Sequence, residues 1–255
     1  MHEIKSNFRI YVLNHTSLGA NSLVEKSVQI DSGSDFIVQA ITGTGTSRAF
    51  NVRFRDSFQG PWNDKRIDSR LIVGTADNPY ILPSPRVLPA NSQLYYDFED
   101  TSGSANTIQV CLLGYEIYQR PVFTIPDIKT RKFRTYTIDA VRTASQRLKE
   151  NIKIDPTGHF LLRAIVGKHT TGRTYKIVLS DSFFKNWSNE QVNNSNFIAA
   201  FVNDNLGGSD NNDLLPFVLP TPRFLPSGTT LEFDIEGDAS GDTIQISLIG
   251  EEIPA

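Results

Sequence analysis

The stretch LPSPRVLPANSQL at residues 82–94 recurs as LPTPRFLPSGTTL at residues 219–231, with seven of thirteen positions identical. A second pair, TIQVCLLGYEI at 107–117 and TIQISLIGEEI at 243–253, shares seven of eleven positions. Self-similarity at a wide, regular spacing indicates a repeated structural unit. The sequence therefore predicts that the chain contains the same module twice.

The repeat extends outward from these anchors to almost the whole chain. DSFQGPW at 56–62 corresponds to DSFFKNW at 181–187, and FRIYVL at 8–13 corresponds to FRTYTI at 133–138. These pairs are 125 residues apart, whereas the proline stretches are 137 residues apart. The second copy therefore has 12 additional residues (137 − 125) between its tryptophan motif and its proline stretch. The Gly-, Asn- and Asp-rich segment 203–213 is the expected insertion, because these residues favour surface turns.

Length and composition are those of an ordinary folded protein with two domains. The 255 residues allow one large or two average domains, and the repeat favours two: residues 1–120 and 134–255, with an extended linker at 121–133. Hydrophobic residues make up 39% and charged residues 21%. The net charge of −3 predicts no general affinity for nucleic acid or anionic membranes, and no apolar run reaches the roughly 18 residues of a membrane span.

Alternation of apolar and polar residues predicts the fold class. The apolar positions expected to face the core are Leu94, Tyr96, Phe98, Ile108, Val110 and Leu112 and, in the second copy, Leu231, Phe233, Ile235, Ile244, Ile246 and Leu248. A period of two indicates half-buried strands. We therefore predict an all-β protein of two tandem antiparallel β-sandwiches related by internal duplication, of jelly-roll type if the connections cross between sheets. A short helix is expected only in VRTASQRLKE at 141–150.

Histidines and cysteine, which often carry chemistry, are few and scattered. The four histidines have no metal-ligand spacing and are interpreted as surface or turn residues: His2, His15, His159 and His169. Cys111 is the single cysteine, which excludes an intramolecular disulfide, and it aligns with Ser247. A packed, inert thiol is favoured over a nucleophile, which would need a neighbouring base and a stabilised thiolate.

Carboxylates occupy equivalent positions in the two copies: Asp97, Glu99 and Asp100, then Asp234, Glu236 and Asp238. A glycosidase pair or calcium ligands are alternatives, but alternation along a strand explains them as a solvated face, because same-face neighbours lie about 6.5–7 Å apart. A calcium site at Asp210, Asn212 and Asp213 has suitable oxygen donors but no recognised ligand order. We therefore predict no catalytic, cofactor-binding or metal-binding residues.

Two tryptophans and a basic run remain as candidate contact residues. Trp62 and Trp187 occupy matched positions in D-S-F-x-x-x-W. A core role is favoured for them, and stacking on a sugar or filling a partner's pocket is the alternative. The basic run IKTRKFR at 128–134 is interpreted as a solvated linker, with binding to an acidic partner as the alternative.

The L-P-x-P-R-x-L-P entry, the alternating strand, the small-residue turn and the closing I-x-[VI]-x-L-x-G-x-E-I strand resemble the small β-sandwich structural proteins of bacteriophage virions, including jelly-roll capsid and decoration proteins. The resemblance covers both copies. It implies a non-enzymatic subunit that binds copies of itself and other virion proteins, without a cofactor or small-molecule substrate.

The first residues lack the features of a secretory signal, so we expect assembly in the host cytoplasm and a final location in the virion. The alternative from another class is a carbohydrate- or receptor-binding module that uses Trp62, Trp187 and the 203–213 loop.

Overall fold

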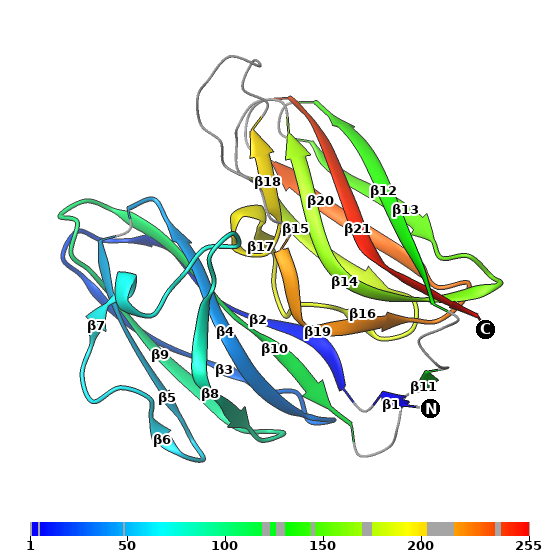
Figure 1. The fold of residues 1–255 in the computed structure, drawn as a ribbon. Coiled ribbons are helices and arrows are strands. Elements are labelled where there is room, and N and C mark those ends of the chain that lie inside the picture. Colours follow the sequence, from blue (N-terminus) through cyan, green and yellow to red (C-terminus); the bar gives the residue numbers. More distant parts are fainter. Residues whose placement is uncertain are drawn as a thin grey trace.

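The structure, a computed structural model, describes residues 2–4, 6–47, 49–118, 123–125, 131–143, 146–169, 175–202, 217–237 and 241–254. These residues form two β-sandwiches that lie side by side (Figure 1). A short antiparallel pair, β1 (His2–Ile4) with β11 (Phe123–Ile125), stands apart from both. The segment 203–213, the expected insertion, lies outside the described residues.

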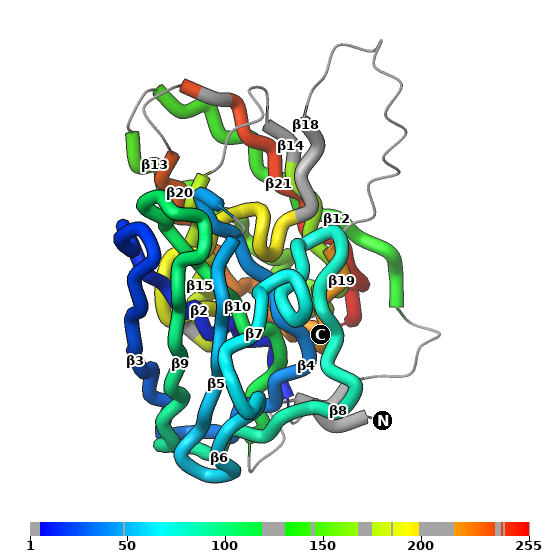
Figure 2. Tube along the Cα trace, turned by 90° about the vertical axis from the view of Figure 1, so that its left-hand side faces the viewer, coloured from blue at the N-terminus to red at the C-terminus, as the bar shows by residue number. Residues whose placement is uncertain are grey.

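The first sandwich has two antiparallel sheets. One sheet has the order β2 (Ser6–Leu18), β10 (Asn106–Ile117), β4 (Asp35–Gly45) and β8 (Tyr80–Leu88). The other has the order β3 (Leu23–Gln29), β9 (Gln93–Asp100) and β5 (Phe50–Asp56), with β6 (Gly60–Pro61) and β7 (Ile67–Asp68) both paired to β5. Figure 2 turns this second sheet toward the viewer. A 3-10 turn, η1 (Ser69–Leu71), follows β7.

The second sandwich repeats this arrangement. One sheet has the order β12 (Lys132–Arg142), β21 (Asp242–Pro254) and β14 (Gly158–His169), and β14 also pairs with β18 (Ala199–Val202) and β19 (Phe217–Leu225). The other has the order β13 (Arg147–Lys153), β20 (Thr230–Gly237) and β15 (Tyr175–Asp181), with β16 (Lys185–Asn186) and β17 (Val192–Asn193) on β15. The turn η3 (Asn194–Asn196) follows β17.

The strand order is that of a jelly roll, because most successive strands change sheet: β2, β4, β8 and β10 belong to one sheet and β3, β5, β6, β7 and β9 to the other. The elements of the second sandwich correspond to those of the first in the same order. Strand β18, which runs parallel to β14, corresponds to a single parallel bridge between Thr42 and Gly74 in the first sandwich. The predicted fold class, all-β with antiparallel sandwiches, is confirmed, whereas the common origin of the two copies stays a prediction.

The positions expected to face the core do so. Leu94, Phe98 and Leu112 are buried in the first sandwich, and Leu231, Phe233 and Leu248 in the second. All the other positions named for the alternating strands are buried as well. These side chains lie between the two sheets of their sandwich, since they alternate with residues of the opposite face.

The helix expected at 141–150 is wrong. Strand β12 continues to Arg142 and pairs with β21, and β13 starts at Arg147 and pairs with β20. Residues that favour helix by composition are placed here in the backbone ladders of two sheets. Helix propensity amounts to a few tenths of a kcal/mol per residue and is outweighed by such tertiary pairing. Leu148, which lies within the range of the predicted helix, packs partly buried against the core from β13 instead.

Candidate functional site

The two repeated motifs meet in space and form a cluster that we call the first clasp: Asp56, Trp62 and Arg86. The Oδ2 atom of Asp56 accepts hydrogen bonds from Trp62 Nε1 at 2.8 Å and from Arg86 Nε and Nη2 at 3.0 and 2.8 Å. Burial raises the pKa of Asp56, but hydrogen bonds from the Gln59 N–H, Arg86, Trp62 and the Phe58 N–H outweigh it, so the pKa lies below its usual range. Asp56 ends β5 and Arg86 lies on β8, so the first clasp joins the two sheets.

The second clasp consists of Asp181, Trp187 and Arg223 and has the same geometry. Asp181 Oδ2 accepts from Trp187 Nε1 at 2.8 Å and from Arg223 Nε and Nη2 at 3.1 and 2.6 Å. The guanidinium of Arg223 also lies 4.6 Å from the centroid of the Trp187 ring, a cation–π distance. This clasp is buried completely, and burial lowers the pKa of Arg223 in spite of the neighbouring carboxylate.

The clasps explain why the aspartate, tryptophan and arginine recur at matched positions. In each clasp the aspartate pairs with the arginine and also accepts a hydrogen bond from the tryptophan, so the carboxylate is satisfied as a buried ion pair requires. Trp187 is buried, which confirms its expected core role, and Trp62 is half-buried against the first core. The geometry fits a structural fastening between sheets, because the carboxylate oxygens already accept several hydrogen bonds.

The edge of β2 pairs with the second sandwich (Figure 1). The N–H of Ile10 donates to the carbonyl oxygen of Trp187 at 2.9 Å, and Ile10 forms a parallel bridge with Ser188. The amide of Asn189 accepts from the Val12 N–H at 2.6 Å and donates to the Val12 carbonyl at 3.2 Å. The segment that follows β16 therefore adds to the open edge of β2.

The second clasp itself takes part in this contact. Arg223 Nη1 donates to the carbonyl oxygen of Phe8 at 2.5 Å, and the Phe224 N–H donates to Asn7 Oδ1 at 3.2 Å. The arginine that closes the second sandwich thus also fastens the first sandwich to it.

A buried amide cluster lies beside this contact. Gln109 Oε1 accepts from the Asn193 N–H at 2.6 Å and from Asn196 Nδ2 at 2.9 Å, while Gln109 Nε2 donates to the Gln191 carbonyl at 3.0 Å. Asn196 Nδ2 also lies 3.4 Å from Cys111 Sγ. Cys111 is buried, which confirms the expected packed thiol, and burial raises the pKa of this thiol far above the usual value. The lack of reactivity of the thiol stays a prediction.

Sequence reasoning missed this interface. The outward side chains of the first sandwich that it buries form one apolar cluster with the core of the second: Phe8, Ile10, Val12, Cys111 and Leu113. A signal was present in the sequence, because the outward positions Ile10 and Val12 correspond to exposed Thr135 and Thr137 in the second copy. An outward strand face that is apolar in one copy and polar in the other indicates a face that is covered in only one of them.

The carboxylates on the alternating strands are structural, and three of them are buried, which contradicts the expected wet face: Asp97, Asp234 and Asp100. Asp97 is buried with Arg55 at 2.6 Å and Arg66 at 3.9 Å. Asp234 is buried with Arg147 at 2.6 Å and Lys149 at 3.8 Å. Long basic side chains cover Asp97 and Asp234, because their aliphatic stems can lie over a carboxylate while the charged end pairs with it.

Asp100 and the two glutamates of this set have uncharged hydrogen-bond donors instead of basic partners. Asp100 is buried and caps a turn, since it accepts from the Ser102 hydroxyl at 2.7 Å and the Asn21 N–H at 3.0 Å. Glu99 and Glu236 are half-buried and accept from Asn51 and Gln191. Asp238 lies outside the described residues, as do the proposed calcium ligands Asp210, Asn212 and Asp213.

The histidines do not come together. His159 is buried rather than at the surface, because its Nδ1 accepts from the Ser227 N–H at 3.0 Å and its ring lies 5.3 Å from that of Phe224. His15 is half-buried on β2, and His2 and His169 lie on β1 and β14. Among the residues that the structure describes, no group of three or more His, Cys, Asp or Glu side chains could hold a metal ion.

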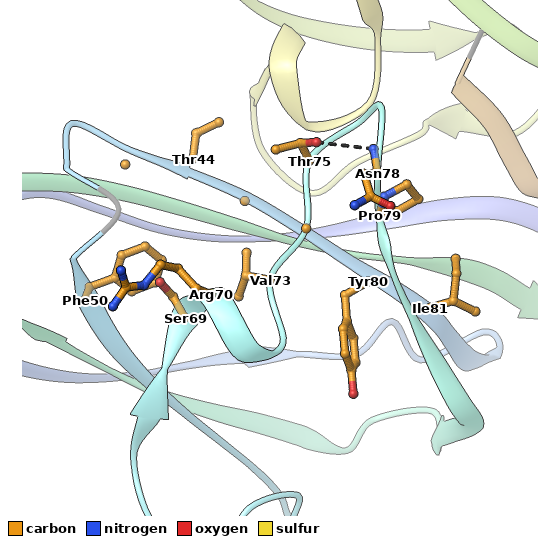
Figure 3. A pocket seen from close by; sticks show the side chains of 13 residues that line it. Thr44, Phe50, Ser69, Arg70, Val73, Thr75, Asn78, Pro79, Tyr80 and Ile81 are labelled. Atoms are coloured by element: carbon orange, nitrogen blue, oxygen red, sulfur yellow. Dashed lines mark hydrogen bonds between the residues drawn. The ribbon is translucent and has the colours of Figure 1, made fainter. Parts of the chain in front are cut away.

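Two open pockets flank η1 in the first sandwich. One, of about 400 Å³, has a polar rim that includes Thr44, Arg70 and Thr75, and Figure 3 shows these side chains with the hydrogen bond from the Asn78 N–H to Thr75 Oγ1. The other, of about 390 Å³, is mainly apolar and lies beside the first clasp, with Trp62 in its wall. Within the described ranges, no helix is long and apolar enough to cross a bilayer.

Comparisons with known proteins return solved structures only at low similarity. No protein-family model matches the sequence, and no curated protein sequence matches it. A chain from the work titled "The Triple Jelly Roll Fold and Turret Assembly in an Archaeal Virus" is 12% identical, with a TM-score of 0.28; the match covers 96% of this chain and 59% of the other. The chain thus spans 59% and 60% of the first two structures that it matches.

Two further structures match over nearly the full length of both chains. A turret protein of Sulfolobus turreted icosahedral virus is 13% identical with a TM-score of 0.24, and the match covers 97% of this chain and 98% of the other. The major capsid protein of bacteriophage PM2 is 9% identical with a TM-score of 0.24, and the match covers 95% and 97%. At these identities and TM-scores the matches do not place the chain in a family.

Proposed function

We propose that this chain is a non-enzymatic structural subunit of a bacteriophage virion, a capsid or capsid-associated protein. The observation that carries the proposal is that two jelly rolls are fastened into one body through the edge of β2, with a core cluster that continues across the contact. A rigid pair of β-sandwiches offers fixed surfaces to neighbouring subunits, as assembly into a closed shell requires.

The matched residues of the two copies support the same proposal. The aspartate, tryptophan and arginine of D-S-F-x-x-x-W and L-P-x-P-R are used in the two clasps, where they hold sheets together. Repeated residues that serve packing rather than chemistry fit a protein whose task is to keep its shape.

The remaining parts of the proposal concern domains, partners and location. Residues 1–120 and 134–255 are two repeats that arose by duplication, joined by the segment 121–133, whose last two residues, Lys132 and Phe133, begin β12. The partners are copies of this chain and other virion proteins, the chain works without a cofactor or small-molecule substrate, and it binds neither nucleic acid nor membrane directly. It is assembled in the host cytoplasm and resides in the virion.

Cross-linking mass spectrometry of intact particles tests this function. We expect cross-links from both sandwiches to other virion chains or to further copies of this chain. Absence of the chain from purified particles would contradict the proposal.

A carbohydrate- or receptor-binding module is the second candidate, because the apolar pocket beside the half-buried Trp62 is open in the first sandwich. An aromatic ring beside a pocket can stack on a sugar. A glycan array with the wild-type protein and the Trp62→Ala variant tests it: binding of a defined sugar that the variant loses would favour this candidate.

A further inference from the structure

The contact between the two sandwiches joins two unlike surfaces. One, the strand side, is the edge and outward face of β2; the other, the clasp side, is β19 together with the second clasp. By the correspondence of the two copies, β12 is a second strand side, and β8 with the first clasp is a second clasp side. A contact between unlike surfaces leaves one of each without its counterpart in a single chain.

The strand side of the second sandwich is exposed where that of the first is covered. Phe8 is 0% exposed at the contact, whereas the equivalent Phe133 is 78% exposed. The side chain of Arg9 is 12% exposed and donates to the carbonyl oxygen of Asn186, whereas that of the equivalent Arg134 is 44% exposed. A phenylalanine this exposed at the start of an edge strand is unusual on a surface that contacts only water.

Arg134 is nevertheless held as Arg9 is held. Each arginine is fixed by an aspartate and a glutamate: Arg9 by Asp31 at 2.7 Å and Glu116 at 3.5 Å, and Arg134 by Asp155 at 3.8 Å and Glu252 at 3.1 Å. Each guanidinium lies over a tyrosine, Tyr11 or Tyr136, at 5.6 or 5.3 Å. The side chain is therefore ordered in advance for a contact like that of Arg9, which lowers the entropy that binding must overcome.

The clasp side of the first sandwich is open where that of the second is sealed. The side chain of Arg86 is 23% exposed and that of Arg223 is 3% exposed. Trp62 and Leu82 are half-buried, whereas their equivalents in the second sandwich are buried. The apolar pocket of about 390 Å³ lies at this place and is lined by Trp62, Leu82 and Arg86 among others.

We infer that a second copy of this chain places its β12 on β8 and the first clasp, and so repeats between chains the contact that joins the sandwiches within a chain. In this arrangement Phe133 packs beside Trp62, Arg134 donates to the Pro61 carbonyl, and the backbone of β12 pairs with the segment after Trp62. The inference deepens the proposed function, on which it rests, by naming the partner. Since the two surfaces are unlike, repetition of the contact produces a ring or an open row of chains.

The contact between chains is expected to be weaker than the contact within a chain. Thr135 and Thr137 stand where the internal contact has Ile10 and Val12, so less apolar area is buried. Asp64 is the equivalent of Asn189, whose amide bonds both the N–H and the carbonyl of Val12 in the internal contact. The carboxylate of Asp64 can accept from an N–H but cannot donate to a carbonyl, so one of these two hydrogen bonds is missing between chains. Reversible association that depends on concentration follows.

Sedimentation velocity over a range of protein concentrations is the first test. We expect the wild-type protein to associate, and Phe133→Ala to weaken association by about tenfold or more, as loss of an aromatic anchor does. Phe183→Ala is the matched control, because Phe183 is a similarly exposed phenylalanine on the turn after β15, outside the proposed contact. A wild-type protein that stays monomeric at every concentration, or equal effects of both variants, would overturn the inference.

Cysteine cross-linking between two single variants is the second test. Asp64→Cys and Thr137→Cys change exposed residues that correspond to the bonded pair Asn189 and Val12, and native Cys111 is buried. Under oxidation the mixture should form a disulfide-linked dimer of one chain of each kind, because a disulfide needs Cα atoms about 4.4–6.8 Å apart. Gln59→Cys mixed with Thr137→Cys is the control and should give none.

The outcomes separate this inference from the proposed function. If the chain is a component of purified particles but the Asp64→Cys and Thr137→Cys mixture yields no more dimer than the control, the inference is wrong and the structural function stands. If the chain is absent from particles, the proposed function fails whether or not the dimer forms.

Discussion

Replacing Arg223 with methionine should destabilise the protein more than the same change at Arg86. Met fills much of the space of the arginine stem, so the main loss is the charged group. In Arg223→Met the carboxylate of Asp181, which is fully buried, loses both of its guanidinium donors. Removing one partner of a buried ion pair costs about 3–5 kcal/mol, because the other charge stays buried without compensation. The lost hydrogen bond to the Phe8 carbonyl adds about 1 kcal/mol.

Arg86→Met breaks the same bonds in a clasp that water can reach. The Asp56 side chain is itself buried, but the Arg86 side chain is partly exposed, so water can enter where the guanidinium is lost and solvate Asp56. We expect a loss of about 1–3 kcal/mol. Equilibrium unfolding in urea measures both, with fluorescence as the probe, since one tryptophan belongs to each clasp. The double variant Arg223→Met with Asp181→Asn should recover part of the loss, because the buried charge is removed. Equal losses for the two arginine variants, or no recovery in the double variant, would refute this reasoning.

Three other variants or measurements follow from the fold. Leu94→Ala and Leu231→Ala should each lower the free energy of unfolding by about 2–5 kcal/mol, whereas Glu99→Ala and Glu236→Ala, on half-buried side chains, should lower it by about 1 kcal/mol or less. Similar losses for the leucine and glutamate variants in urea titrations would show that the strand register is wrong. Hydrogen bonds, first from the Ser102 hydroxyl, lower the pKa of Asp100 to about 2, so the contribution of Asp100 to stability is present above about pH 4 and is lost as the pH falls toward 2. Acid unfolding of Asp100→Asn should therefore show a weaker pH dependence in that window, and an unchanged acid midpoint and slope would contradict this prediction. Cys111 should react with a thiol reagent only as fast as the protein opens, and fast reaction in the native state would contradict its burial.

The strands and their inward faces could be predicted from the sequence because each is a local pattern. Leu94, Phe98 and Leu231 alternate with polar residues, and that alternation is enough to assign the buried face. The helix expected at 141–150 is wrong because the local pattern there fits either a helix or a strand. The backbone pairing of this segment with β20 and β21 makes it strand. Buried Asp97 shows a further limit, since the arginine that covers it comes from a neighbouring strand.

The clasps and the interface could not be predicted because they depend on residues far apart in the chain. The D-S-F-x-x-x-W and L-P-x-P-R motifs were each visible, but nothing in their spacing shows that Asp56 and Arg86 meet across two sheets. The contact between Ile10 and Trp187 likewise joins residues from different copies. Comparison of the copies with each other contained the missing signal, because Ile10 and Val12 are apolar where Thr135 and Thr137 are polar.

Cryo-electron microscopy of purified phage particles tests the central claim most directly. The account predicts density for two adjoining jelly rolls of this chain at symmetry-related positions, with β2 against the segment after Trp187 as in the isolated chain. Particles at full occupancy of their structural proteins, with no density for this chain at any position, would contradict it.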